Sequence, residues 1–446
     1  MTFGAVSKLR ARVSRLRRDL LAYVYDYDRG INEEIIAHVL ECMGGRICDD
    51  NPAKRRWARA VAQYRCQLAM RPWFSKWGFE IASLFALPAF LIWAVLTPRN
   101  TTQDTTVDGV RLVFPSRWAT SPEIFAVPGE LGADTIETAQ LARHALFFAD
   151  TGLIVRFLTR CVKSGTPFPF QLALKCAVDL GKVRGALDGF IPSYVLVYWE
   201  FSCGLSFLTD ALSRDGIAVY NVMHGDKHFY AKHAFFEVER CYCWNDWYVD
   251  VFKSEHAHAD FRVFDNPAFE LSEDERHWLT DHPSESIGIA APHIATLARE
   301  TGAVKHAAKA LTRAINALAE EAEVTVRPHP FYAEDFEQFR DTLSGSVRIE
   351  PADSKPARRF ILEHAVIVGT VSSILLEAAH IGRQVVVLST PVMESVESYH
   401  YLYQLPNVRT ATVETLSAII ADVDRSAPLV QTVHDRARPS EQHRMP

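Results

Sequence analysis

The chain has 446 residues and a formal net charge of −6, with 48% hydrophobic and 23% charged residues. This length is large for one core and predicts two domains with an extension. The acidic balance argues against nucleic acid as the main partner. Eight cysteines lack a regular spacing and no cleavable signal peptide precedes them, which is typical of free thiols in a reducing cytosol.

Residues 1–75 are predicted to form a basic helical N-terminal extension. Leu9, Val13, Leu16 and Leu20 recur at helical spacing. Lys and Arg are in clear excess in this region, so the remainder of the chain is decidedly acidic.

Residues 76–99 are predicted to be a hydrophobic segment that associates with a membrane. The run from Ile81 to Leu96 has no charge, contains Pro88, and is flanked by aromatic and basic residues, as interfacial segments are. It is short for a full span of roughly 20 residues. A single crossing would also place residues 100–446 away from nucleotide donors. We therefore expect a shallow, proline-broken insertion at the cytoplasmic face of the inner membrane, with a full crossing or a buried core helix as alternatives.

An N-terminal Rossmann-like domain for the acceptor is predicted over residues 100–270, because strands and helices alternate as in a doubly wound parallel sheet. A capping box at Asp134 and Glu137 predicts a helix that runs through Phe148. The other expected strands are 110–114, 194–198, 218–222, 241–244 and 261–264, and the other expected helices are 152–163, 169–184, 204–213 and 246–253.

A C-terminal Rossmann-like domain for the nucleotide donor is predicted over residues 271–430. The acidic, proline-containing segment 268–284 is predicted to connect the two domains, and residues 431–446 are expected to be disordered. The expected strands are 286–290, 324–326, 347–349, 365–368 and 384–388, and the expected helices are 303–321, 334–343, 357–363, 373–382 and 413–423.

Two short motifs, each at the end of a predicted strand, give the strongest indication of a site. His329 stands between two prolines after strand 324–326, and Ser372 and Ser373 open a helix after strand 365–368. Carboxyl ends of parallel strands are where open α/β sheets bind ligands. A helix that starts with two serines offers N–H groups, hydroxyls and a positive dipole end to an anion. We predict a phosphate or nucleotide site with the candidate residues Arg327, His329, Pro330, Thr370, Ser372, Ser373 and Glu377.

The same residues have ordinary structural explanations. As imidazolium His329 would neutralise a phosphate, and as an acid it would assist a leaving phosphate. A turn histidine and a serine N-cap are the alternatives. Glu377 lies one turn after Ser373 and would reach ribose hydroxyls, or it is a solvated helix carboxylate.

A second pair of candidates lies in the first domain. His224 and Gly225 follow strand 218–222, where a glycine leaves room for the close approach of a ligand. His224, Asp226 and Glu200 are candidates for the general base on an acceptor hydroxyl. For Asp226 and Glu200, a cap or a surface charge is the alternative.

No metal or cofactor is predicted. His224 and His228 have the spacing of two ligands on a helix, but no HExxH or carboxylate pattern accompanies them. Nearby Lys227, Lys232 and Lys253 suit an anionic substrate better. The GxGxxG, GxxxxGK[ST] and GxSxG motifs are missing, which argues against NAD enzymes, P-loop ATPases and α/β-hydrolases.

The pattern resembles the GT-B glycosyltransferases that build bacterial surface polysaccharides. Within them it is similar to the sialyltransferase and polysialyltransferase group and to the CDP-glycerol glycerophosphotransferases. Those families carry an HP motif and an S or SS motif, and the glycerophosphotransferases also carry a His-Gly pair. The resemblance covers about residues 190–430, and the matching residues are His329-Pro330, Ser372-Ser373 and His224-Gly225.

The resemblance implies an α/β GT-B fold of two Rossmann-like domains facing a cleft, with the helical extension in front. It implies a metal-independent transferase that moves a sugar from a nucleotide-activated donor, with CMP- and CDP-linked sugars as candidates, to a growing capsule, lipopolysaccharide or lipid-linked glycan. The sialyltransferase motif that supplies the base has no clean copy here, so the base stays open between Asp226, Glu200 and His224. Polyol phosphate transfer, a hydrolysing nucleotide-sugar epimerase and a non-catalytic glycan-assembly protein are the alternatives.

Overall fold

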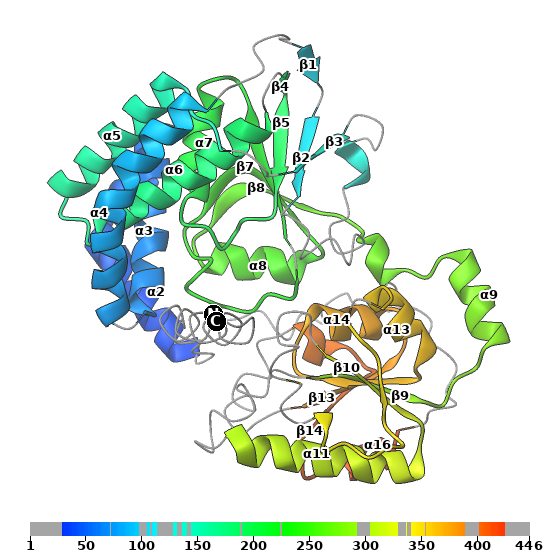
Figure 1. The fold of residues 1–446 in the computed structure, drawn as a ribbon. Helices are drawn as coiled ribbons and strands as arrows, with labels where there is room; N and C mark the ends of the chain where they lie inside the picture. Colours follow the sequence, from blue (N-terminus) through cyan, green and yellow to red (C-terminus); the bar gives the residue numbers. More distant parts are fainter. Residues whose placement is uncertain are drawn as a thin grey trace, which may run out of the picture. The chain divides into compact units, whose positions relative to one another are not determined.

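The computed structural model divides the chain into two α/β units, each with its own six-stranded parallel sheet (Figure 1). The first unit holds residues 1–115, 127–223 and 229–264, and the second holds 116–126, 224–228 and 265–446. The structure describes residues 29–71, 73–97, 105–107, 109–113, 128–131, 136–140, 144–187, 190–223, 225–291, 304–328, 336, 340–352, 354–388 and 401–423.

The sheet of the first unit has the order β3–β2–β5–β6–β7–β8, and every neighbouring pair is parallel. Its inner strand β5 is buried along its whole length, as a strand covered on both faces must be. A separate parallel pair joins β1 to β4. The strands are β1 (Thr105–Val107), β2 (Gly109–Val113), β3 (Ile136–Gln140), β4 (Phe190–Pro192), β5 (Tyr194–Val197), β6 (Ala218–Val222), β7 (Glu237–Cys243) and β8 (His258–Val263).

The helices of the first unit are stacked outward from its sheet. One helix packs directly on β6 and β7, two more pack on that helix, and the remaining long helices pack on those two. Figure 1 shows α2 to α6 together on one side of the sheet. Outward from the sheet the order is α7 (Leu205–Ser213), then α3 (Pro52–Ala69) and α6 (Pro169–Ala186), then α2 (Arg29–Met43), α4 (Trp73–Leu96) and α5 (Phe148–Lys163). The others are α8 (Asp246–Ser254), which packs on β7 and β8, and the short 3₁₀ helices η1 (Gly44–Cys48) and η3 (Gly129–Leu131).

Three arginines of α3 bind one buried carboxylate of the sheet in the same unit. Glu237 begins β7, and its side chain is 2% exposed. It accepts hydrogen bonds from Arg55 at 2.9 and 3.0 Å and from Arg56 at 3.2 Å, and Arg59 lies 3.2 Å from it. A buried carboxylate with this many donors is well compensated. Part of the basic excess of the N-terminal region therefore serves the packing of α3.

α4 is one continuous helix through Pro88, so the predicted break at this proline is wrong. A proline inside a helix costs about 3 kcal/mol, and tertiary contacts on both sides of it offset that cost. Before it, the Glu80 carboxylate accepts from the N–H groups of Phe170 (3.0 Å) and Gln171 (2.8 Å) at the start of α6. After it, Leu91 is buried within the unit.

The helix predicted from Asp134 through Phe148 is also wrong. Residues 136–140 form β3, which pairs in parallel with β2 along its whole length, and the helix α5 begins only at Phe148. Pairing with β2 outweighs the local capping pattern. The first turn of α5 is closed instead by Asp150, whose Oδ2 accepts from the N–H of Phe147 at 2.8 Å.

The sheet of the second unit has the order β11–β10–β9–β12–β13–β14, again entirely parallel. Figure 1 shows α13 and α14 on one face of this sheet and α11 and α16 on the other. The main core cluster joins α11 and α16 to the buried strand residues, among them Ile289, Val326 and Val368. The strands are β9 (Ile287–Ala290), β10 (Val324–Arg327), β11 (Arg348–Ile349), β12 (Val366–Gly369), β13 (Gln384–Leu388) and β14 (Val408–Ala411). The helices are η5 (Pro267–Phe269), α9 (Glu273–Asp281), α11 (Val304–Glu321), α13 (Ala357–Glu363), α14 (Ser373–His380), η8 (Tyr401–Gln404) and α16 (Leu416–Ala421).

The segment predicted to connect the domains contains a helix that the sequence pattern did not reveal. Ser272 and Glu275 form a capping box at the start of α9, with N–H to side-chain distances of 2.9 and 3.2 Å. The strands β1, β4 and β14 were likewise not predicted.

Most other predicted strands and helices of both units agree with the structure to within a few residues, and β6, β13 and α13 agree at both ends. The predicted helix 334–343 falls largely outside the described residues. The helical pattern of Leu9, Val13, Leu16 and Leu20 and the tail 431–446 lie wholly outside them. Two parallel α/β units with a helical N-terminal region confirm the predicted fold class, an α/β GT-B architecture of two Rossmann-like domains. The cleft between them stays a prediction.

Candidate functional site

The strand order of the second unit marks one edge of its sheet as the place for a ligand. In chain order its six strands occupy the positions 3-2-1-4-5-6, which is the order of the Rossmann dinucleotide-binding fold. The order reverses between β9 and β12, and ligands bind outside the carboxyl ends of the strands at such a switch point. β12 ends at Gly369 and leads within four residues to α14. The predicted serine motif therefore lies at the switch point.

Gly369 lets the ends of β9 and β12 approach closely. A Cβ atom at this position would lie 2.9 Å from the carbonyl oxygen of Ala290 and 3.0 Å from Cδ1 of Leu375. Both distances are shorter than or at the limit of normal contacts, so a larger residue would push β9 or α14 away. The glycine thus fixes where the start of α14 lies relative to β9.

Ser372 is the N-cap residue of α14, but its hydroxyl does not cap the helix. Its backbone is extended (φ −165°, ψ 162°), and its carbonyl accepts from the N–H groups of Leu375 (3.1 Å) and Leu376 (3.2 Å). A serine N-cap ordinarily accepts a hydrogen bond from the second or third N–H of the helix, and the Ser372 side chain makes no such bond. Ordinary capping therefore does not explain this hydroxyl.

A second segment of the same unit approaches Ser373. Residues 224–228 belong to the second unit, and Gly225 has a positive φ of 71°, a conformation that glycine adopts readily. A Cβ atom at Gly225 would lie 3.0 Å from Oγ of Ser373 and 3.9 Å from Nζ of Lys227. Lys227 is 2% exposed. A serine hydroxyl and a buried ammonium group thus approach the same glycine at the start of α14, where the helix dipole also favours an anion.

Lys227 is the functional candidate that sequence reasoning undervalued. The pattern identified it only as one of several positive charges near His224. Lys227 and Ser373 both lie near the Cβ position of Gly225. This depends on a contact between segments far apart in the chain, which no local sequence pattern reveals. His224 itself lies outside the described residues, and Asp226 is half-buried in the same segment.

Glu377 is buried, so it is not the solvated helix carboxylate that was the alternative to a contact with ribose hydroxyls. It is 2% exposed, and Oε1 accepts from Nη1 of Arg358 at 3.2 Å. Arg358 also binds Glu275 at 2.8 and 2.9 Å and the carbonyl oxygen of Ala268 at 2.6 Å. The hydrogen bond from Arg358 holds the pKa of Glu275 below its usual value. Glu377 therefore belongs to a charged network that ties α14 to α13 and α9.

Arg327 is held by protein groups at the end of β10. Nη1 donates to Glu350 at 2.8 Å, and Nη2 donates to the carbonyl oxygens of Ala352 (2.7 Å) and Lys355 (2.6 Å). The residue is 6% exposed. These contacts fit a structural role, in which Arg327 braces the strand that leads to His329. His329 and Pro330 lie outside the described residues.

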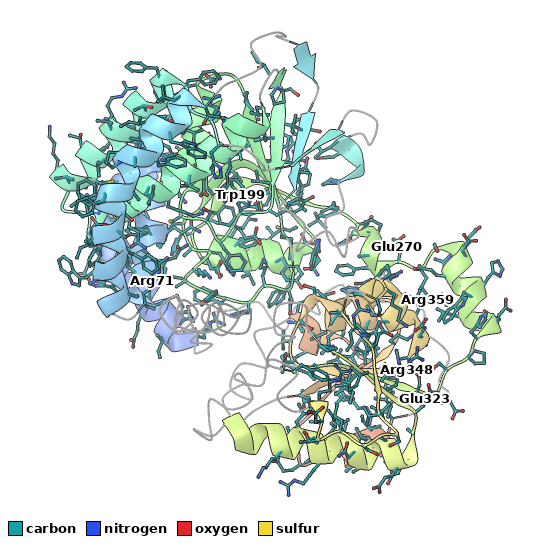
Figure 2. All side chains as sticks on the ribbon, in the orientation of Figure 1. Arg71, Trp199, Glu270, Glu323, Arg348 and Arg359 are labelled. Carbon is teal, nitrogen blue, oxygen red and sulfur yellow. The ribbon has the colours of Figure 1, made fainter. Side chains whose placement is uncertain are left out.

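Glu200 occupies the corresponding position in the first unit. Its sheet order reverses between β2 and β5, and Glu200 follows β5 by three residues. Oε2 accepts from Nδ2 of Asn221 at 3.3 Å, and Oδ1 of Asn221 accepts from the N–H of Trp199 at 2.8 Å. Figure 2 labels Trp199 inside this unit. Glu200 is 0% exposed, and Gln63 of α3 donates to its carbonyl oxygen at 2.7 Å, so α3 covers this strand end.

Thr370, which lies in the chain between β12 and Ser372, is half-buried, and its role at the site stays a prediction. Among the described residues, no group of three or more His, Cys, Asp or Glu side chains is placed to hold a metal ion.

Comparison with known proteins adds likenesses of fold only. No family model and no curated protein matches the chain. The UDP-GlcNAc 2-epimerase of Methanocaldococcus jannaschii in complex with UDP-GlcNAc and UDP is 13% identical, with 73% of this chain and 95% of that chain covered and a TM-score of 0.45. S. aureus MnaA with UDP is 14% identical (72% and 89% covered, TM-score 0.43). E. coli ADP-heptose lps heptosyltransferase II is 13% identical (70% and 99% covered, TM-score 0.35). At TM-scores below 0.5 these likenesses support no conclusion on function, and the site rests on the contacts of the chain itself.

Proposed function

We propose that the chain is a glycosyltransferase that moves a sugar from a nucleotide-activated donor to a cell-surface polysaccharide or lipid-linked glycan. The observation that carries the proposal is the start of α14 at the switch point of a sheet with Rossmann strand order. There, the Ser372 hydroxyl is not used for capping, and Ser373 lies against Gly225 with the ammonium group of Lys227 nearby. Such a group of donors suits a nucleotide phosphate.

In this mechanism the phosphate of the donor is held by Ser372, Ser373, Thr370 and the N–H groups of α14, with Lys227 balancing its charge. A base takes the proton of the acceptor hydroxyl while the acceptor oxygen attacks the anomeric carbon. The bond from that carbon to the phosphate oxygen breaks, and the nucleotide leaves with a negative charge. Fixed donors that stabilise this charge supply a large part of the rate enhancement, so the step requires no metal ion.

The other candidate residues would assist the leaving phosphate, orient the ribose or act as the base. His329 would lie beside the leaving phosphate as a hydrogen-bond donor or acid, with its backbone fixed by Pro330 and its strand end braced by Arg327. Glu377 would orient the ribose from the second turn of α14. For the base, the complete burial of Glu200 favours Asp226 or His224.

A nucleotide-binding measurement tests the donor half of the site. Thermal unfolding of the full chain is followed with CMP, CDP, UDP and GDP, because a ligand specific for the native state stabilises it by about 2.7 kcal/mol at a hundredfold excess over its Kd. We expect one nucleotide class to stabilise the chain. We expect Ser372→Ala with Ser373→Ala to weaken its binding at least tenfold, since hydrogen bonds to charged groups are worth about 1.5–3 kcal/mol each.

The matched control is Ser346→Ala, which removes an exposed hydroxyl elsewhere in the second unit. It should bind nucleotide as the unaltered chain does. If no nucleotide stabilises the chain, or if the double serine variant binds as tightly as the control, the site is misplaced.

His329→Ala tests the transfer step. Turnover of a panel of nucleotide sugars is followed by nucleotide release with and without glycan acceptors. We expect His329→Ala to abolish transfer while its unfolding temperature stays unchanged. Near-normal turnover by this variant would contradict the assignment. Nucleotide release by the unaltered chain without acceptor would instead indicate a hydrolysing epimerase, and binding without turnover would indicate a non-catalytic protein.

A further inference from the structure

One half of α4 carries large apolar side chains that the first unit leaves exposed. These residues, which we call the outer face of α4, are each 44–74% exposed. They fall within one side of the helix when placed at 100° per residue. The outer face consists of Trp77, Ile81, Leu84, Phe85, Ile92, Trp93 and Leu96.

The opposite side of α4 is fixed to the first unit. Leu87, Leu91 and Ala94 are buried, and α4 packs on α6. The N–H of Leu146 donates to the carbonyl oxygen of Ala94 at 3.1 Å, and Glu80 caps the start of α6. The helix is therefore held with one side inward and the outer face turned away from its own unit.

α4 is long and apolar enough to cross a membrane by its length and composition, and 17% of an apolar 18-residue window within Ser75–Leu96 is buried. Its two flanks, however, pack together. Before α4, the Tyr64 hydroxyl of α3 lies at hydrogen-bond distance from the carbonyl oxygen of Phe168 (3.0 Å) and from Oε1 of Gln171 (2.9 Å), and both of these residues follow α4. Arg55 of α3 likewise binds Glu237. A single crossing would place these partners on opposite sides of the bilayer, so the fold of the first unit is incompatible with it.

The charges near α4 match an anionic surface. From Ile81 to Leu96 the helix has no charged residue, and its single carboxylate, that of Glu80, is bound to α6. At its N-terminal end stand Lys76 and, in the preceding turn, Arg71, which is labelled in Figure 2. Burial and the neighbouring Arg71 lower the pKa of Lys76. Tryptophan and cations at such an end are typical of membrane interfaces.

A cavity of about 470 Å³ lies at this basic end, between α2, α3 and the start of α4. Arg65, Lys76 and His38 line it, with Glu34 as its acidic residue. Nε of Arg65 is buried and has no hydrogen-bond partner among the described residues. A buried guanidinium nitrogen without an acceptor favours a bound anion.

We propose that the outer face of α4 docks on the surface of an anionic phospholipid bilayer, with α4 lying in the plane of the membrane and with a lipid phosphate at the cavity of Arg65 and Lys76. α4 remains packed on α6 and does not cross. Helices that bind in this way bury their apolar side into the boundary between headgroups and acyl chains, and their cations attract anionic lipids. This inference is independent of the proposed transferase activity.

Vesicle binding of the full chain tests the proposal. Flotation with vesicles of phosphatidylcholine and phosphatidylglycerol is compared between the unaltered chain and Phe85→Asp with Ile92→Asp. We expect the double variant to bind at least tenfold more weakly, with an unchanged unfolding temperature because both side chains are exposed. Val263→Asp, on the exposed surface of β8 in the same unit, is the matched control and should bind normally. Equal binding by the double variant would overturn the proposal.

A second variant tests the cavity. Arg65→Gln with Lys76→Gln should lower binding to the anionic vesicles severalfold and leave the weaker binding to pure phosphatidylcholine unchanged. An unchanged preference for the anionic vesicles would refute the role of the cavity.

Accessibility distinguishes docking from crossing. In inside-out membrane vesicles from expressing bacteria, a membrane-impermeant thiol reagent should label both Cys48, which is exposed and precedes α4, and an engineered Ser346→Cys after it. Protection of either thiol alone would show a crossing. Light scattering tests whether the outer face of α4 instead binds a second copy of the chain. If Phe85→Asp with Ile92→Asp turns a dimer into a monomer and leaves vesicle binding intact, the face is a dimer interface and the proposal is wrong.

Discussion

The carboxyl edges of the two parallel sheets differ in how their polar side chains are bound. In the first unit, Glu200 and Asn221 at the strand ends are fully buried, bound to each other, and covered by Gln63 of α3. In the second unit, Ser372 and Ser373 at the end of β12 are half-buried, and the Ser372 hydroxyl is not used for capping. Among the described residues, this edge is closed by protein groups in the first unit, and in the second unit it carries a serine hydroxyl that does not cap its helix.

A switch point in the strand order therefore marks a place for a ligand but does not by itself show that a ligand binds there. Both sheets have such a point. What separates them is whether other parts of the chain bind the groups at the strand ends. In the first unit, Asn221 of β6 binds the Glu200 carboxylate and Gln63 of α3 binds the Glu200 carbonyl oxygen. Variants that disturb the closed edge should therefore affect stability, and variants that disturb the open edge should affect binding.

The largest effect on the stability of the first unit is expected from Glu237→Ala, at the amino end of β7. It would leave the buried Arg59 and the half-buried Arg55 and Arg56 around a missing carboxylate. Breaking a buried pair costs about 3–5 kcal/mol. Urea unfolding measures the loss. Asp260→Ala, which removes an exposed partner of Arg240, is the control and should cost about 1 kcal/mol or less. Equal losses for the two variants would show that the arginine cluster does not hold α3 in place.

A smaller effect is expected from Glu200→Gln, which tests whether the closed edge takes part in the chemistry. Gln keeps the shape of the side chain, and a general base contributes about 10²–10⁴-fold to the rate. We expect turnover to change by less than that and nucleotide binding to stay unchanged, because Glu200 is completely buried. A loss of turnover in that range, together with an altered pH profile, would identify Glu200 as the base.

The smallest effect is a pH dependence of the second unit. His364 is buried, its Nδ1 donates to the carbonyl oxygen of Phe360 at 2.7 Å, and a Cβ atom at Gly288 would lie 2.8 Å from its ring. Burial lowers the pKa of His364 below its ordinary value of 6.5. The unfolded chain then binds more protons, so stability is full above pH 6.5 and falls as the pH drops toward the lowered pKa. Unfolding free energies at pH 7.5 and 5.5 should differ less in His364→Asn than in the unaltered chain, and an equal difference would contradict the assignment.

Most strands of the fold could be predicted from the sequence, because its strongest patterns are apolar runs of the length of a strand. Tyr194–Val197 and Val366–Gly369 are buried along their whole length, and a buried parallel strand needs such a run. The serine motif was predictable for the same reason, since it directly follows a strand of this kind. Local patterns failed where a distant contact decides: the pairing of β3 with β2, the continuity of α4 across Pro88, and the approach of Gly225 to Ser373.

The second unit is not a single stretch of the chain, and this affects how the protein can be divided. Residues 225–228 belong to it, although they lie between strands β6 and β7 of the first unit. A fragment that begins at Asp265 would keep all six strands and both serines but would lose Gly225 and Lys227. Such a fragment would retain a Rossmann-like sheet with an incomplete anion site. An exchange of donor specificity with another protein would therefore have to move two separate pieces of sequence together.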